Sequence, residues 1–179
     1  LSAFWVARHY NNEAPIVGIP KAIDQIPLDE EIYAGKNVLM VDIVTCDYLT
    51  ILEKAKTLVI LDHHKTSQER LKRLSNAYFD MTKSGVGLAW EYFYGNDLKL
   101  PPFLAYIQER DLFSFTLPDS KEFNAGLMSY MEAHCSDIES RLCVLNGLWA
   151  NQCCKENPLQ EFITLGKFVS ASRNAINKR

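Results

Sequence analysis

The stretch TLVILDHHKT, residues 57–66, runs from apolar residues straight into an acid, two histidines and a lysine. Residues 58–61 are apolar and partly β-branched, so the run at residues 57–62 predicts a buried strand. The chain has four histidines, and two of them, His63 and His64, stand side by side where this strand ends. A polar turn would explain the pair taken alone, so its meaning depends on the surrounding sequence.

The strand lies within an alternation of strands and helices. Residues 37–44 predict a second strand buried on both faces, residues 77–81 a shorter strand, and residues 15–20 a short strand-like run. Single helical segments, residues 46–55 and the amphipathic residues 67–76, separate the main strands. This order predicts an α/β fold with a mostly parallel sheet flanked by helices.

The second half of the sequence is helical. Apolar periodicity and the prolines that interrupt it predict helices over residues 84–94, 101–111, 122–131, 137–149 and 159–176. There is no internal repeat and no long linker. We therefore expect a single α/β domain over residues 1–179 with a helical C-terminal part.

Composition excludes several functional classes. The chain is 47% apolar and 23% charged, with a net charge of -3, so no strongly basic surface favours nucleic acid or anionic lipid. No apolar stretch reaches the roughly 18 residues of a membrane span, and no secretion signal is evident. Five cysteines without paired spacing are typical of reduced thiols. These features predict an intracellular, cytoplasmic protein that does not contact membranes.

Two acids stand where predicted strands end. Asp42 lies near the end of the 37–44 run, and Asp62 closes the 57–62 run. Neighbouring parallel strands end about 5 Å apart, at the edge where such sheets bind ligands. Asp42 and the turn from Asp62 to His64 are therefore expected to share one site. Carboxylates and imidazoles together suit divalent transition metals.

The motif order resembles the DHH family of phosphoesterases. The resemblance rests on V-D at residues 41–42, D-H-H at residues 62–64, KSGVGLAWEYF at residues 83–93 and YIQERDLF at residues 106–113. It covers roughly residues 1–126. Four features in the same order are far more specific than a lone D-H-H triplet.

The resemblance implies a role for each matching residue. Asp42 would bridge two metal ions, and His63 and Asp111 would be further metal ligands. His64 would approach the substrate phosphate as a catalytic residue, and Asp62 would orient the neighbouring histidine. As alternatives, Asp42 could cap a turn and Asp111 could simply end its helix.

Other residues near these motifs have two readings. Lys65 is either a surface lysine or a contact to phosphate, and Thr66 could cap the following helix. Ser84 is a predicted helix cap. With Gly85 beside it, this helix N-terminus could also receive a substrate phosphate.

The resemblance implies hydrolysis of phosphodiester or phosphoanhydride bonds with two divalent ions, Mn²⁺ foremost and Mg²⁺ or Co²⁺ as alternatives. Such a pair of ions clamps the attacking and leaving oxygens and generates the nucleophile from water. Expected substrates are nucleotides or short oligonucleotides, as for oligoribonuclease-like members. Polyphosphate or pyrophosphate, as for exopolyphosphatase-like members, is the alternative.

The chain departs from the family at both ends. The first motif, a histidine and two aspartates, has no counterpart, and we expect that it lies upstream of Leu1. The usual C-terminal substrate domain is also absent, and residues 159–179 are expected to lead toward it. With three direct ligands for two ions, this chain is expected to hold metal weakly and turn over little. The rival hypotheses are a binding module without catalysis and a scaffold in which D-H-H is coincidental.

Overall fold

The computed structural model describes residues 1–11, 15, 17, 27–152 and 158–176. The predicted strand over residues 15–20 therefore falls largely outside the described residues. The chain divides into two compact units. The sheet unit comprises Val6–Leu98, and the helical unit comprises Leu1–Trp5 with Lys99–Arg179. None of the described helices is both long and apolar enough to cross a membrane.

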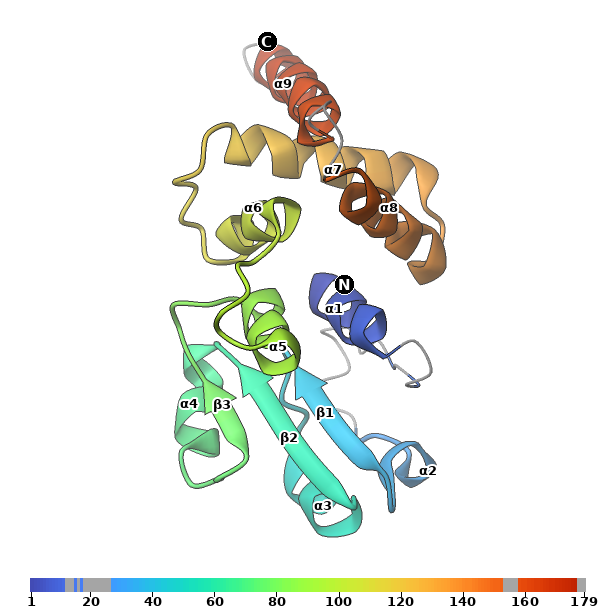
Figure 1. The fold of residues 1–179 in the computed structure, drawn as a ribbon, viewed down its shortest axis with the longest axis vertical. Helices are drawn as coiled ribbons and strands as arrows, with labels where there is room; N and C mark the ends of the chain where they lie inside the picture. The colour runs from blue at the N-terminus through green and yellow to red at the C-terminus, as the bar shows by residue number, and fades with distance from the viewer. Residues whose placement is uncertain (12–14, 16, 18–26, 153–157, 177–179) are drawn as a thin grey trace. The chain divides into compact units, whose positions relative to one another are not determined.

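The described residues of the sheet unit form three parallel strands in the order β1-β2-β3 (Figure 1). These are β1 Asn37–Val41, β2 Thr57–Asp62 and β3 Ala77–Phe79. The helices are α2 Glu30–Tyr33, α3 Tyr48–Lys54, α4 Lys65–Leu71 and α5 Gly85–Tyr94, and α1 Ser2–Tyr10 begins the chain. The described part is thus a mixed α/β fold with a small parallel sheet, as the alternating pattern predicted.

The core of the sheet unit lies against one face of the sheet. Met40 of β1 and Leu58 and Ile60 of β2 pack there with Ile51 of α3 and Leu71 of α4. Alternate residues of a strand share a face. Asp62, two residues beyond Ile60, therefore lies on this same side, and only 1% of its side chain is exposed.

Two local predictions were wrong. Residues 37–44 were expected to be a strand buried on both faces, but β1 ends at Val41 and only Met40 in it is buried. The reason is topological, because among the described strands β1 lies at the edge of the sheet and β2 takes the middle position. Thr66 does not cap α4, because the helix begins at Lys65 with His64 at the N-cap position.

The helical unit is built from α6 Pro102–Asp111, α7 Ser120–His134, α8 Ile138–Asn151 and α9 Leu159–Ile176. All four helices were predicted, with ends shifted by one to three residues except for α9, which matches fully. Trp5 packs on Phe103 and Trp149 and donates a hydrogen bond of 2.8 Å from Nε1 to Asn146 Oδ1. Trp5, 2% exposed, is therefore a core residue of this unit.

Candidate metal centre

Asp42 follows the last residue of β1 in a left-handed conformation, with a φ of 65°. Its backbone N–H donates a hydrogen bond of 2.9 Å to Leu61 O, which ties it to β2. Aspartate adopts this conformation more readily than most residues, although it still carries a backbone cost. The turn leaves the Asp42 carboxylate at the carboxyl edge of the sheet, 41% exposed.

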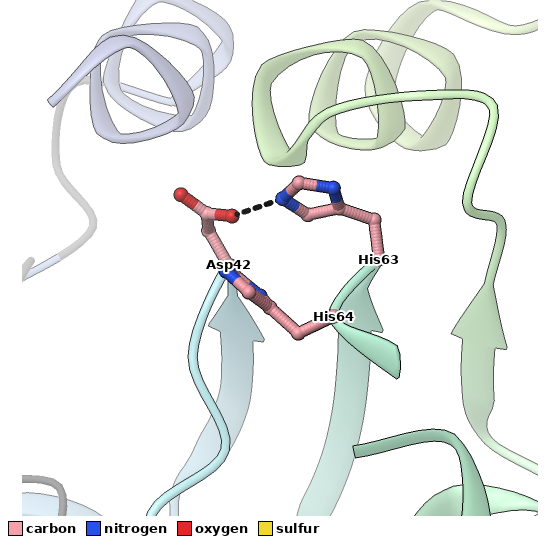
Figure 2. A group of neighbouring side chains, drawn as sticks. All are labelled: Asp42, His63 and His64. Atoms are coloured by element: carbon pink, nitrogen blue, oxygen red, sulfur yellow. Dashed lines mark hydrogen bonds and ion pairs between the residues drawn. The ribbon is translucent and has the colours of Figure 1, made fainter. Parts of the chain in front are cut away.

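His63 follows the last residue of β2, beside Asp42. Its Nε2 lies 3.0 Å from Asp42 Oδ1, and Figure 2 shows the ring and the carboxylate facing each other beside the first turn of α5. Only 9% of the His63 side chain is exposed. The predicted meeting of these two residues is present, because β1 and β2 pair directly and in parallel.

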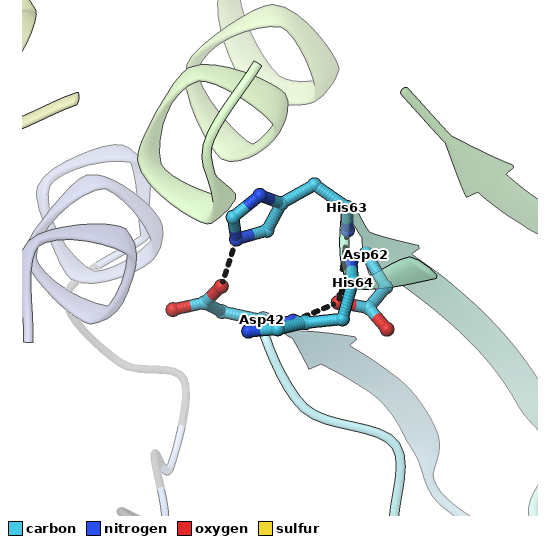
Figure 3. A network of polar contacts seen from close by, with 4 residues as sticks. All are labelled: Asp42, Asp62, His63 and His64. Carbon is cyan, nitrogen blue, oxygen red and sulfur yellow. Dashed lines mark hydrogen bonds and ion pairs between the residues drawn. The ribbon is translucent and has the colours of Figure 1, made fainter. Parts of the chain in front are cut away.

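Asp62 organises both histidines from beneath the site (Figure 3). Its Oδ1 accepts hydrogen bonds from His63 N at 2.9 Å and His64 N at 3.3 Å, and lies 2.8 Å from His64 Nδ1. A carboxylate at Nδ1 fixes the proton on that nitrogen. The Nε2 of His64 is then the nitrogen left for a ligand or substrate.

The electrostatics of the cluster favour a cation. Asp62 is fully buried, and its Oδ2 has no hydrogen-bond partner among the described residues. With neutral histidines, Asp42 and Asp62 together contribute a charge of about -2. A buried carboxylate with an unsatisfied oxygen is costly unless opposite charge lies nearby.

The potential metal-ligand atoms of Asp42, His63 and His64 lie close enough together for one cation to bind them. One ligand atom each from Asp42, His63 and His64 lies within 4.8 Å of the others. Opposite ligands of one ion stand about 4.2–4.4 Å apart when each bond is about 2.1 Å. A displacement of about half an ångström would therefore suffice for shared ligation.

The loop after β3 places the N-terminus of α5 against this cluster. Asp80 Oδ1 accepts a hydrogen bond of 2.8 Å from Thr82 N, and Lys83 forms ion pairs with Asp80, at 3.4 Å, and with Glu91. The hydrogen bond to Glu91 is the main cause of the raised pKa of Lys83. Asp80 was not predicted beside the site, because the strand expected over residues 77–81 ends at Phe79 and leaves this acid in the following loop.

Gly85, the first residue of α5, packs directly on Asp42. A Cβ placed on Gly85 would lie 2.5 Å from Asp42 Cβ and 2.7 Å from its Oδ1. Ser84, fully buried, occupies the predicted N-cap position, but its side chain makes no capping hydrogen bond to the helix. Gly85 was predicted to approach phosphate, and the structure adds that it leaves room for the Asp42 side chain.

Gly85→Ala is expected to weaken Mn²⁺ binding at least tenfold, because the added methyl group must displace the Asp42 side chain. The overpacking should also lower the free energy of unfolding by about 1–3 kcal/mol. Calorimetric titration and thermal unfolding measure the two effects. Gly147→Ala is the matched control, since a Cβ there meets nothing within 4 Å. Unchanged Mn²⁺ affinity in Gly85→Ala would refute this role.

The structure thus brings together Asp42, Asp62, His63 and His64, with Gly85 alongside. Lys65 is the exposed first residue of α4. Asp111 is the exposed last residue of α6 in the helical unit, and its participation in the site stays a prediction.

Comparison with known proteins leaves the family open. No protein-family model matches the chain, and no solved structure matches it. The chain is 42% identical over 93 residues to a protein of Acanthamoeba polyphaga mimivirus described only as uncharacterized. The matched region spans 50% of this chain and 22% of the viral protein. Fold and site therefore define a mixed α/β chain with an Asp–His cluster at the carboxyl edge of its sheet.

Proposed function

We propose that this chain is a DHH-type phosphoesterase that hydrolyses phosphodiester or phosphoanhydride bonds of nucleotides or short oligonucleotides with divalent cations. The observation that carries the proposal is the Asp42–His63–His64 cluster above the buried Asp62. The motif order along the sequence supports the same activity, and polyphosphate is the alternative substrate.

The donor set fits divalent transition metals. One carboxylate and two imidazoles suit Mn²⁺, Zn²⁺ or Fe²⁺ better than Ca²⁺, which takes oxygen ligands. Asp42 and His63 would hold the first ion, and the two oxygens of Asp42 allow it to bridge to a second. The unsatisfied buried oxygen of Asp62 also favours positive charge nearby. Mn²⁺ is the proposed metal, with Asp111 as a further proposed ligand.

In the proposed reaction, Asp42 and His63 would bind the metal ions and His64 would contact the phosphate. When bound, the divalent ions neutralise phosphate charge and lower the pKa of water. Asp42 and His63 fix their position, since each is held by the end of a strand. His64, oriented through Nδ1 by Asp62, presents Nε2 to the phosphate, and in its protonated form it donates to a phosphoryl or leaving-group oxygen.

Asp42→Asn tests the proposal with little change in shape. Asparagine also tolerates the left-handed backbone at this position, but it removes the charge that would hold the metal. We expect the variant to fold normally, to lose at least tenfold in Mn²⁺ affinity, and to lose metal-dependent hydrolysis. Calorimetry, Mn²⁺ electron paramagnetic resonance and circular dichroism measure these effects. The activity panel contains dinucleotides, nucleoside phosphates, pyrophosphate and polyphosphate.

The results separate the rival hypotheses. Equal Mn²⁺ binding by the original chain and Asp42→Asn would overturn the metal centre and leave the D-H-H triplet as coincidence. Metal binding that depends on Asp42, without hydrolysis of any panel member at saturating Mn²⁺ even by a form of the protein that carries the first motif, would favour a binding module. Hydrolysis of polyphosphate and of no other panel member would identify polyphosphate, instead of nucleotides or oligonucleotides, as the substrate.

A further inference from the structure

The helical unit contains a groove that no part of the proposed chemistry uses. It is a groove of about 280 Å³ formed by α6, α7, α9 and the loop at residues 112–119. This size lies near the lower end for small-molecule sites. We call it the α7 groove. Its lining includes Arg110, Phe115, Lys121, Met128, Glu132 and Arg173.

The α7 groove concentrates positive charge on a chain that is acidic overall. Arg110, Lys121 and Arg173 line it with a single carboxylate, Glu132, which gives a local charge of about +2 against -3 for the chain. All three cations are exposed, and none of them forms an ion pair within the residues that the structure describes. These cations can therefore bind an anionic ligand without breaking an existing ion pair.

An aromatic wall accompanies these charges. Phe115 lines the groove, with Lys121 Nζ 5.3 Å from the centre of its ring. The ring of Phe113 packs edge-on against Phe115 at 6.2 Å and is 81% exposed, more than any other large apolar residue described. Exposed phenylalanine loses the free energy that burial would give. A planar ligand stacked on this wall would recover part of it.

The loop that presents the two rings is held in an unusual conformation. Phe113 and Phe115 have φ angles of 54° and 46°, which bulky residues rarely adopt. The buried Glu109 carboxylate accepts hydrogen bonds of 2.7 Å from Thr116 N and 2.9 Å from Leu117 N. Tyr106 donates a further one, of 2.9 Å, to Pro118 O. The aromatic wall is therefore formed before any ligand arrives, which lowers the cost of binding.

We infer that the α7 groove binds a nucleotide, either free or as one unit of a single strand. Its phosphate would lie against Arg110, Lys121 and Arg173, and its base would stack on Phe115, the combination with which proteins bind single strands. Glu132 provides an acceptor for ribose hydroxyl or base amino groups. The same carboxylate, in a concave site, disfavours an anionic membrane surface. The inference does not depend on the metal centre and holds whether or not the chain hydrolyses phosphoesters.

The experiment measures binding in EDTA, so that metal chemistry plays no part. The probe is a fluorescein-labelled single-stranded RNA heptamer, followed by anisotropy, with AMP and inorganic phosphate as competitors. The double variant Lys121→Gln/Arg173→Gln should bind at least tenfold more weakly and with a shallower salt dependence. Phe115→Leu should weaken binding about tenfold, and Phe115→Tyr, which keeps the ring, should restore it.

Lys167→Gln is the control, because Lys167 lies on α9 like Arg173 but outside the groove lining. Its side chain forms an ion pair of 3.0 Å with Asp119. Competition by AMP as strong as by unlabelled heptamer would identify a free nucleotide as the ligand, and competition by the heptamer alone would identify a strand. The inference fails if inorganic phosphate competes as well as AMP. It also fails if Lys167→Gln loses as much affinity for the heptamer as the double variant does. A parallel binding measurement with anionic lipid vesicles gives a further test, and the inference fails if the protein binds the vesicles but not the heptamer. Circular dichroism confirms that each variant is folded.

Discussion

In an active form of the protein that also carries the first motif, His64→Ala is expected to slow phosphoester hydrolysis by about 10²–10⁴-fold while leaving Mn²⁺ binding nearly intact. The proposed reason is the orientation of the ring. Asp62 Oδ1 engages Nδ1 at 2.8 Å and leaves Nε2 for the phosphate. Steady-state kinetics at saturating Mn²⁺, with a model phosphodiester and with polyphosphate, measure the loss. His134→Ala is the control, since His134 is the last residue of α7 in the other unit.

His63→Ala should have the opposite profile and lose metal affinity first. His63 Nε2 lies 3.0 Å from Asp42 Oδ1, so its removal takes away one of the two closest potential ligands. The cluster geometry also permits His64 as a third ligand. Metal titrations on both variants therefore test whether His63 alone, or both histidines, bind the metal. Equal loss of Mn²⁺ in His64→Ala and His63→Ala would show that both histidines hold metal. Unchanged turnover in both variants would remove the pair from catalysis.

The order of strands and helices could be predicted from the sequence, because the spacing of apolar residues indicates which side chains are buried. The run at residues 57–62 is the central strand β2 and matches its predicted bounds, since both of its faces are covered. The run at residues 37–44 has similar composition but forms a strand that ends at Val41 and lies at the edge of the sheet within the described part of the chain. Composition alone does not distinguish a central from an edge strand, because that difference depends on which neighbours pair.

The candidate site was predictable where strand order determines it. Asp42 and His63 meet because β1 and β2 pair in parallel, which the alternation of strands and helices implied. The packing of Gly85 on Asp42 was not predictable, because it depends on how α5 lies against the strand ends. The left-handed backbone conformation of Asp42 was not predictable either. It belongs to a single turn and produces no periodic pattern in the sequence.

The packing of α7 on α9 could not be predicted either, and Gly166→Ala should disrupt it severely. A Cβ on Gly166 of α9 would lie 1.7 Å from Glu122 O of α7, and one on Gly126 of α7 would lie 1.9 Å from Phe162 O of α9. Both contacts are to backbone, which cannot move aside as a flexible side chain would. The helices must separate, and we expect a loss of about 3 kcal/mol in the free energy of unfolding.

Thermal and chemical unfolding measure this loss, with an expected fall in Tm of about 6–12 °C. Gly147→Ala provides a control of opposite sign, since it lies in α8 and a Cβ there meets nothing within 4 Å. Alanine is the better helix former, so that variant should gain about 0.5–1 kcal/mol. If Gly166→Ala were instead as stable as Gly147→Ala, the close crossing of α7 and α9 would be wrong. A loss confined to Gly166→Ala and Gly126→Ala would establish that two glycines, 40 residues apart in the sequence, set the distance between these helices.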